Sequence, residues 1–135
     1  MANILEDLVE YCEAQSLGTA GTDLIPGRLP EKGTPATCTG FVLYGGAGPE
    51  HRLDGVRTPT QEFPRVQVRV RAATLAAAMT KAYAIWNKLA AVSNTTLNAT
   101  RYRAIHVLQS PFELERDGED RPIVAFNLEA EKAPS

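Results

Sequence analysis

The spacing of apolar residues near the start of the chain predicts a helix. In residues 3–16 apolar side chains recur every three or four positions, and Asn3 stands where a side chain can cap the first free amides. Gly18 supplies the permissive backbone that ends such a helix. The apolar positions are Ile4, Leu5, Leu8, Val9 and Cys12, and the acidic positions are Glu6, Asp7, Glu10 and Glu13. We therefore expect an amphipathic helix with an acidic outer face.

A second helical pattern begins after Thr74 and extends to about Val92. Its apolar residues follow one another at intervals of three or four positions, which is typical of a stripe that packs on a sheet. The stripe consists of Leu75, Met79, Ala82, Trp86 and Leu89. The helix is also rich in alanine, so its flanks are smooth enough to pack closely against another element or another subunit.

Strict alternation of apolar and polar residues predicts the clearest strand, at residues 65–71. The valines at alternate positions fall on one face, which we expect to join the core, and the other face is cationic. Pro111 divides a later strand pattern into two parts. The remaining strand patterns are a short one at residues 24–25 and longer ones at residues 36–44, 101–109, 112–116 and 123–130.

Two stretches carry loop signals. Residues 45–62 contain almost no large apolar side chain, and Gly45 and Gly46 are expected to end the strand before them. A loop of this length in a small domain usually binds something or is mobile. Residues 93–100 are polar and are also expected to form a loop.

The order of these elements predicts an α+β fold. We expect a mixed, mainly antiparallel sheet of about 4–5 strands with two helices packed on one face. The chain has 135 residues, of which 44% are hydrophobic, so residues 1–130 can form a single domain whose core needs no disulfide or metal. Residues 131–135 are expected to fray. No apolar run approaches the ~20 residues of a membrane helix, and the start lacks the pattern of a signal peptide.

The net charge of -2 hides an uneven distribution along the chain. Residues 1–50 carry seven acidic and two basic side chains, whereas residues 51–103 carry two acidic and nine basic ones. Residues 104–135 carry seven acidic and three basic side chains. A basic middle therefore lies between acidic ends. Such segregation can close within one fold, guide nucleic acid or pair neighbouring subunits.

The residues that commonly carry catalysis or bind metals form no recognisable set. The chain has two histidines, His51 and His106, and neither has the partner spacing of a zinc site. Cys12 and Cys38 are interpreted as small buried hydrophobes. We therefore predict no catalytic residue, no metal and no cofactor. A small hydrolase that uses His51 and Asp54 is kept as the least favoured alternative.

Two further patterns are also interpreted as loops. Residues 45–48 resemble a phosphate-binding loop but lack its Gly-Lys-Ser/Thr ending and run into Pro49. The acidic run from Glu113 to Asp120 lacks the spacing of a calcium loop, so we interpret it as a solvated hairpin turn.

Arginines on one strand face raise the possibility of nucleic-acid binding. Arg65, Arg69 and Arg71 share a face, and Arg101 and Arg103 belong to a strand pattern that can lie beside it. The chain is acidic overall, however, and no aromatic residue is interleaved with these arginines for base stacking. Pairing of the arginine face with acids of an adjacent subunit agrees equally well with the charge counts.

Three motifs in order give the chain a resemblance to the minor capsid and tail terminator proteins of long-tailed bacteriophages. The resemblance covers nearly the whole chain, to about Ala130. The motifs are Gly27-Arg28-Leu29-Pro30, then Pro64-Arg65-Val66-Gln67-Val68-Arg69-Val70-Arg71, and then Tyr102-x-x-Ile105-x-x-x-Gln109-Ser110-Pro111-Phe112-x-Leu114-x-Arg116-Asp117 with Arg121.

The resemblance implies a structural virion protein and not an enzyme. Similar proteins form a ring, typically hexameric, that sits on the last ring of tail-tube subunits and stops tube polymerisation. The ring offers the surface to which the filled head attaches at the neck, so a tail-tube protein and a head-completion or connector protein are the expected partners. DNA passes through the lumen without sequence-specific binding. Assembly is expected in the host bacterial cytoplasm, with no membrane involved.

The residue types suggest two hypotheses for such a ring. A heterologous subunit interface would use opposite charges. Its candidate residues are Arg65, Arg69 and Arg71 on one copy and Glu10, Glu13, Glu113 and Glu115 on the next. The long loop is the candidate for docking on the tail tube, with Gly45, Gly46, Gly48, His51, Arg52 and Asp54 as its residues. The main alternative is a DNA-contacting neck or head-completion protein whose arginine face lines the channel.

Overall fold

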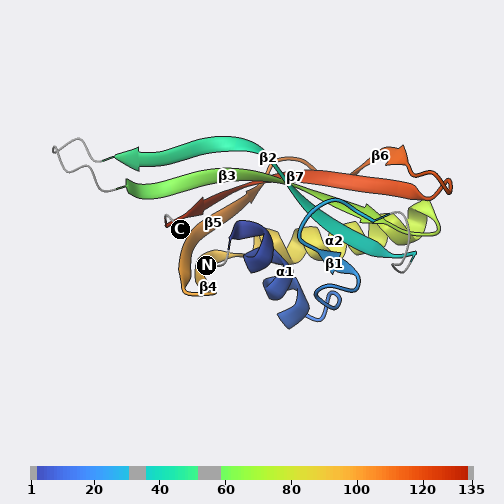
Figure 1. The fold of residues 1–135 in the computed structure, drawn as a ribbon, viewed down its shortest axis with the longest axis horizontal. Coiled ribbons are helices and arrows are strands. Elements are labelled where there is room, and N and C mark those ends of the chain that lie inside the picture. The colour runs from blue at the N-terminus through green and yellow to red at the C-terminus, as the bar shows by residue number, and fades with distance from the viewer. Residues whose placement is uncertain (1–2, 31–35, 52–58, 134–135) are drawn as a thin grey trace.

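The computed structural model describes residues 3–30, 36–51 and 59–133, and within these ranges the chain forms two helices and seven strands (Figure 1). The helices are α1 (Ile4–Ala14) and α2 (Leu75–Ala90). The strands are β1 (Leu24–Ile25), β2 (Cys38–His51), β3 (Pro59–Arg71), β4 (Ser93–Leu97), β5 (Thr100–Val107), β6 (Phe112–Arg116) and β7 (Pro122–Lys132). Neither helix in the described ranges is long and apolar enough to cross a membrane.

The described strands form one sheet in the order β1-β2-β3-β7-β5-β4, and β6 pairs with β7 beyond the end of β5. The pairing of β1 with β2 is parallel, and the other pairings are antiparallel. The predicted α+β class and the mainly antiparallel sheet are confirmed, but the predicted 4–5 strands are too few. One missed strand is β4, whose side chains are mostly exposed, so an edge strand of this kind leaves no apolar alternation in the sequence.

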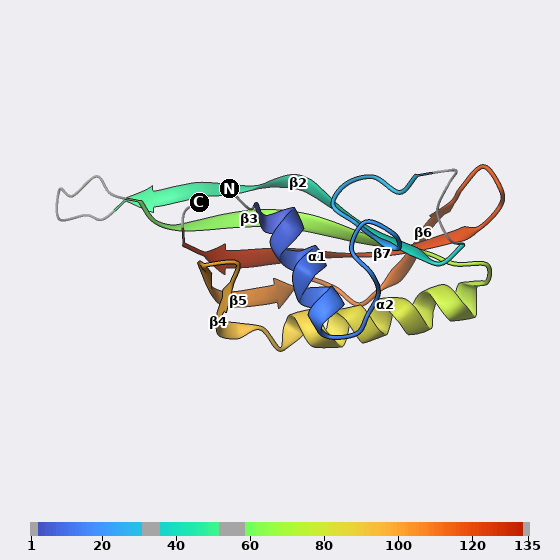
Figure 2. The same cartoon turned by 60° about the horizontal axis from the view of Figure 1, so that its bottom comes forward.

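Both helices cover the same face of the sheet, as Figures 1 and 2 show. Val66, Val68 and Val70 of β3 are fully buried on this face, as predicted from their alternation. Their partners in β7 are Leu128, Phe126 and Val124, which are also fully buried. Burial of these side chains supplies the main apolar driving force for packing the helices on the sheet.

The first helix begins as the sequence predicts, because Asn3 Oδ1 accepts a hydrogen bond from the Glu6 amide at 3.0 Å. One of its acidic residues departs from the prediction. Asp7 is 1% exposed and lies on the core side of α1, whereas the sequence placed it on the outer acidic face. Asp7 is accommodated there because polar groups from β5 and the β4–β5 turn reach it.

The second helix is rotated relative to the predicted stripe. Its fully buried residues are Ala78, Ala82, Ile85 and Leu89, so small alanines let the helix approach the sheet closely. Leu75 is instead 40% exposed, and Met79 and Trp86 are half-buried on a flank of the helix. The predicted cap is confirmed, since Thr74 Oγ1 accepts a hydrogen bond from the Ala77 amide at 3.2 Å.

The last strand extends further than the sequence indicated. β7 continues past Ala130 to Lys132, and Glu131 and Lys132 pair with residues of β5. The Ala133 amide also donates to the carbonyl of Arg101 at 2.9 Å. Residues 131–133 are therefore part of the sheet and not of a frayed tail, and residues 134–135 lie outside the described ranges.

Candidate assembly surfaces

Strands β2 and β3 form an arm that extends beyond the rest of the sheet (Figure 1). Pairing of β3 with β7 ends at Glu62, opposite Lys132. Pairing of β3 with β2 continues to His51, opposite Pro59. We call residues 45–51 and 59–61 the hairpin arm. A two-stranded projection of this kind buries little surface of its own and is suited to contacts with another chain.

The arm corrects the prediction that residues 45–62 form a loop. Gly45, Gly46 and Gly48 belong to β2, and His51 is its last residue. Bulges interrupt the ladder after Leu43 and again between residues 47 and 51, and Gly45 adopts a φ of 152° beside the first of them. A strand without a core face has no apolar alternation, so its pattern in the sequence is that of a loop. Arg52 and Asp54 lie outside the described residues.

The face of the sheet opposite the helices carries a ladder of polar side chains. Arg65 Nε lies 2.9 Å from Glu129 Oε2, and Gln67 Nε2 donates to Asn127 Oδ1 at 3.1 Å. Arg69 Nε donates to Gln67 Oε1 at 2.7 Å. The cationic strand face predicted from the sequence is therefore partly neutralised within the same chain.

The five arginines considered for nucleic acid do not form one continuous patch. Arg101 and Arg103 are exposed on β5, but β7 lies between β5 and β3. The acidic residues Glu129 and Glu131 of β7 occupy this intervening strand, and Glu131 pairs with His106 at 3.2 Å. A row of carboxylates between two groups of arginines weakens the attraction of the face for phosphates.

Arg71 has a different environment from the other arginines of its strand. It is 1% exposed, and its guanidinium donates to the carbonyls of Pro30 at 2.6 Å and Ala36 at 3.4 Å. It also lies 3.7 Å from Asp117 Oδ2. Arg71 thus joins the segment before β2 to the turn between β6 and β7, and it is not available on the surface of this chain.

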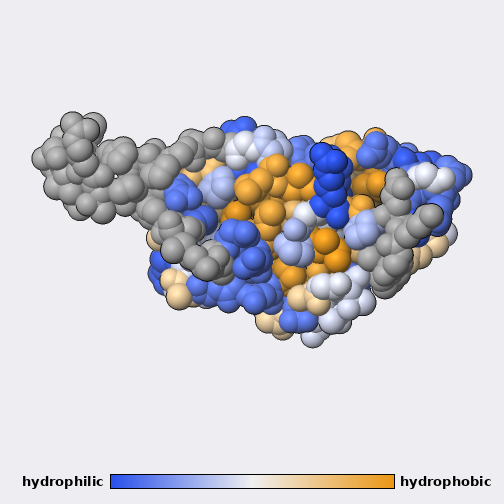
Figure 3. All heavy atoms as spheres, viewed as in Figure 1, coloured by the Kyte–Doolittle hydropathy of each residue, from blue (hydrophilic) through white to orange (hydrophobic). Residues whose placement is uncertain are grey.

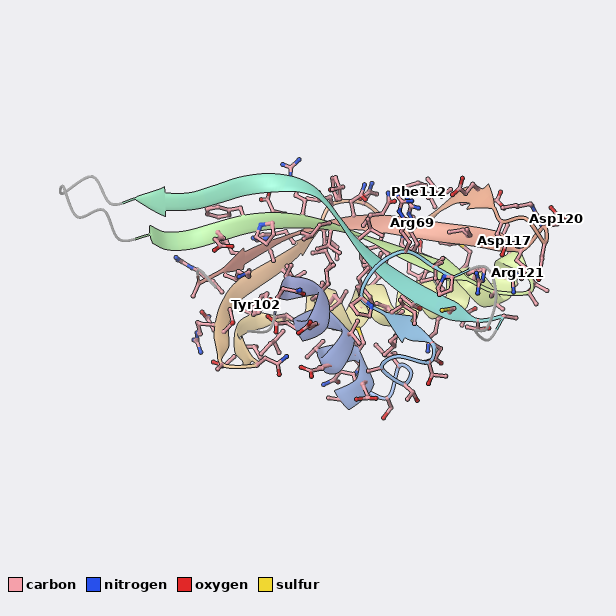
Figure 4. The ribbon with its side chains drawn as sticks, in the orientation of Figure 1. Arg69, Tyr102, Phe112, Asp117, Asp120 and Arg121 are labelled. Carbon is pink, nitrogen blue, oxygen red and sulfur yellow. The ribbon has the colours of Figure 1, made fainter. Side chains whose placement is uncertain are left out.

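Asp117 is the centre of the turn between β6 and β7, at the end of the molecule opposite the arm (Figure 4). It accepts hydrogen bonds from the amides of Glu119 at 3.0 Å and Arg121 at 2.9 Å, and from Arg121 Nε at 2.7 Å. Burial alone would raise the pKa of this carboxyl, but the hydrogen bonds from Arg121 and Glu119 lower the pKa below its ordinary value. The acidic run therefore contains a hairpin turn, as predicted, but its central Asp117 is only 7% exposed and is held by Arg121 instead of being solvated.

A hollow of about 400 Å³ opens between this turn and the polar face. Its lining includes Arg28, Leu29, Val42, Arg69 and Asp117, so it combines both signs of charge with apolar surface. Gly40 pairs with Arg69 in the ladder, and the carbonyl of Gly27 approaches it so closely that a Cβ would be 2.6 Å from that oxygen.

The acids proposed for the subunit interface are accessible, but several have partners within the chain. Glu10 accepts from the Asn98 amide group, and Glu13 Oε2 accepts from the Ala20 amide at 2.9 Å. On β6, Glu113 and Glu115 are exposed, and Glu113 lies 3.9 Å from Arg116. Glu115 lines the same hollow as Arg69 and Arg71, so the structure brings one of these acids near the arginines of the same chain's β3.

A buried polar cluster anchors α1 to β5. Tyr102 donates from its hydroxyl to Asp7 Oδ2 at 2.6 Å, and Asn98 Nδ2 donates to Asp7 Oδ1 at 3.0 Å. Burial raises the pKa of Tyr102, and its hydrogen bond to Asp7 raises it further. An acidic residue next to apolar ones on α1 is the only sequence feature that points to this cluster.

The described residues offer no site for metal chemistry, since they contain no group of three or more histidine, cysteine or acidic side chains that could hold an ion. Cys12 and Cys38 are fully buried, as predicted. Burial raises the pKa of Cys12 to about 12, so its thiol stays protonated and unreactive at neutral pH.

An extended arm and a broad polar sheet face are the kind of surfaces found in components of larger assemblies. The sequence profile of the family described as bacteriophage tail terminator protein matches residues 11–133. The chain belongs to this family, and it is therefore a structural protein of the phage tail. The resemblance identified from the three sequence motifs is confirmed.

A solved structure supports the fold independently. A chain from the virion of a native gene transfer agent particle is similar, with a TM-score of 0.67 and 13% sequence identity. The comparison covers 97% of this chain and 95% of that chain. No curated protein sequence matches this chain. At this identity the likeness concerns the fold alone, and it extends over nearly the full length of both chains.

Proposed function

We propose that this chain forms a ring, typically hexameric, that ends the phage tail tube, stops its polymerisation and provides the surface for head attachment at the neck. Its partners are further copies of itself, the tail-tube protein and a head-completion or connector protein. Membership of the tail terminator family supports this proposal, as does the fold shared with a chain of a virion. The role is structural and needs neither catalysis nor a cofactor.

The observation that carries the proposal is the hairpin arm. Its strands pair with each other beyond the last contact with β7, so they present two edges and two faces to another chain. We assign the arm to docking on the tail tube. The sequence predicts a docking loop around His51. We assign docking to the same region, whose described residues form a β-hairpin.

The alternative, in which an arginine face lines the channel and grips DNA, receives less support. Arg65 is paired with Glu129, and Arg71 is buried in a network with Asp117. A channel wall whose arginines are neutralised in this way lets DNA slide, whereas free arginines would hold its phosphates. We therefore infer that DNA passes through the ring without sequence-specific binding.

The charged interface remains part of the proposal in a narrower form. Arg65 and Arg69 are its cationic candidates, because Arg71 is used within the chain. Charge reversal by Arg69→Glu should weaken ring formation, and more strongly at low salt than at high salt. Light scattering of the variant at both salt concentrations checks this, and an unchanged ring at both would contradict the role of Arg69.

Shortening the arm tests the docking role. Ala47 and Phe63 face each other in the ladder, so residues 48–62 can be replaced by Asn-Gly, which forms a two-residue hairpin turn. We expect the variant to fold, as judged by circular dichroism and thermal melting. In a phage lacking the wild-type protein, it should leave tails that are overlong or without heads in electron micrographs.

The replacement also removes Glu62, whose carboxylate lies 3.6 Å from Lys132, so Glu62→Gln is the matched control. This control should restore normal particles. Normal tails with the shortened arm would refute the docking role. Normal tails in the complete absence of the protein would refute the terminator function itself.

A further inference from the structure

Large apolar side chains are exposed at two separate places on the described surface. Leu43 and Tyr44 of β2 are 48% and 45% exposed, and we call them the β2 edge patch. Leu75 and Tyr83 of α2 are 40% and 39% exposed, and Leu108, which follows β5, is 48% exposed. We call these three residues the α2 flank patch. Grouped apolar exposure of this kind marks an interaction surface more often than scattered exposure does.

The β2 edge patch is exposed because little of the described chain covers the outer side of β2. β1 accompanies β2 at Thr39 and Gly40, before the patch begins. Tyr44 is the extra residue of the bulge between Leu43 and Gly45, which re-aims its side chain. Figure 3 shows apolar surface gathered in the middle of this side of the molecule. An uncovered apolar edge of a sheet is prone to pair with another chain.

Leu75 and Tyr83 of the α2 flank patch belong to one flank of the helix, with the half-buried Met79 between them. Leu75 and Tyr83 are about two helical turns apart on the same side. The ring of Tyr83 packs edge-on against Trp86, with 6.0 Å between centroids. Trp86 Nε1 donates to the carbonyl of Gln109 at 3.0 Å, which holds the segment after β5, including Leu108, beside this flank.

The two patches lie on opposite sides of the subunit. In Figure 2, β2 runs along one side of the molecule and α2 along the other. A contact between the two patches in different copies is therefore heterologous, because each copy contributes a different surface. Repetition of such a contact closes a ring when the rotation between copies allows it.

An exposed cation lies next to the β2 edge patch, and an exposed acid follows Leu108 of the α2 flank patch in the chain. Arg65 lies opposite Gly45 in the ladder, next to the β2 edge patch, and its side chain is 47% exposed. Glu113 follows Leu108 by one short segment, and its side chain is 45% exposed. Opposite charges at the rim of an apolar contact orient the partners and favour the correct pairing.

We propose that the β2 edge patch of one copy packs against the α2 flank patch of the next copy, with Arg65 and Glu113 at the rim of the contact. This inference rests on the proposed ring and names the surfaces that build it. Tyrosine and leucine side chains exposed in the single chain become the apolar centre of the interface, and the charges remain at its edge.

Crosslinking of two single-cysteine additions tests the contact. Leu43→Cys and Tyr83→Cys each place a thiol in one patch, while Cys12 and Cys38 are fully buried and should not react. The two variants are mixed, treated with a bifunctional maleimide and separated on a denaturing gel. We expect a crosslinked dimer in the mixture and little or none with either variant alone.

The Leu43→Cys, Tyr83→Cys double variant should instead give a ladder of crosslinked species that ends at the ring size. Thr96→Cys, at an exposed position of β4 away from both patches, is the control and should stay monomeric when mixed with Leu43→Cys. Equal dimer formation by Leu43→Cys alone, or by the control mixture, would overturn the proposed contact.

Electron microscopy of the wild-type protein distinguishes failure of this contact from failure of the ring itself. Rings of wild-type protein without a mixed crosslink would refute this contact and leave the terminator function standing. Absence of rings at high concentration and on tails would refute the proposed function, and the contact with it.

Discussion

The hydroxyl of Tyr102 donates a hydrogen bond of 2.6 Å to Asp7, and this bond joins β5 to the first helix across the core. Both side chains are almost completely buried. A buried carboxylate is tolerated only when hydrogen bonds replace its hydration, so the pair fixes the orientation of α1 on the sheet.

Tyr102→Phe should therefore lower the free energy of unfolding by about 1–3 kcal/mol, because it keeps the ring but leaves Asp7 short of one donor. Urea denaturation of the variant and the wild type measures the difference. The matched control is Tyr83→Phe, at a ring that is 39% exposed, and its effect should stay within about 0.5 kcal/mol. Equal stability of the two variants would contradict the structural role of the Tyr102 hydroxyl.

Arg69 and Arg71 lie two residues apart on the same face of β3 but should respond differently to substitution. Arg71→Gln removes a buried cation that binds Asp117 and two carbonyls, and it should cost about 3 kcal/mol or more. Arg69→Gln loses a hydrogen bond to Gln67 and should cost about 1 kcal/mol or less. Thermal melting ranks the two, and a larger loss for Arg69→Gln would refute the assignment.

Asp117 should make the stability of the fold depend on pH in the acidic range. Its hydrogen bonds lower its pKa in the folded chain below the ordinary value of about 3.9. The stabilisation is therefore fully present above pH ~4 and is lost as the pH falls through the lowered pKa. Asp117→Asn should be less stable at pH 7 and should lose less stability on acidification than the wild type does.

Asp120→Asn is the control for this measurement. The side chain of Asp120 is 86% exposed, and its backbone has a φ of 59°, which asparagine adopts readily. Its denaturation curves at pH 3 to 7, a range bracketing the ordinary carboxyl pKa of about 3.9, should follow those of the wild type. An Asp117→Asn variant with the same curves would show that this turn does not depend on the charge.

Gly40 should not tolerate a side chain. A Cβ at this position would lie 2.6 Å from the Gly27 carbonyl oxygen and 3.3 Å from Leu29 Cγ, so the backbone of the segment before β2 would have to move. We expect Gly40→Ala to cost about 1–3 kcal/mol, measured by urea denaturation. Gly118→Ala meets no atom within 4 Å and should leave stability nearly unchanged. A neutral Gly40→Ala would mean that this segment adapts freely.

The core strand was predictable because its side chains alternate between protein and solvent. Val66, Val68 and Val70 face the two helices, and the residues between them face outward. The sequence therefore alternates between apolar and polar residues with a period of two. The arm was not predictable in the same way. Its ladder is held by backbone hydrogen bonds, which any residue except proline can make, so no side-chain pattern distinguishes it from a loop.

The residues of the candidate sites could be predicted from the sequence, but their contacts could not. The charges of Arg65, Arg69 and Arg71 could be counted from the sequence, but their partners could not. Register brought Glu129 beside Arg65, and the β6–β7 turn brought Asp117 beside Arg71. The exposed flank of α2 could not be predicted either. The spacing of apolar residues in α2 fits more than one stripe, and the packing of its alanines on the sheet decides which side is buried.

The sequence by itself determined the α+β class, the two capped helices, the valine face of β3 and, through its three motifs, the tail terminator family. These properties depend on the local spacing of apolar residues and on the order of motifs along the chain. Only the tertiary structure decided that residues 45–51 form an arm, that Asp7 is buried and that the arginine face is partly neutralised. These depend on which distant strands become neighbours, and strand order and register are fixed by packing of the whole chain.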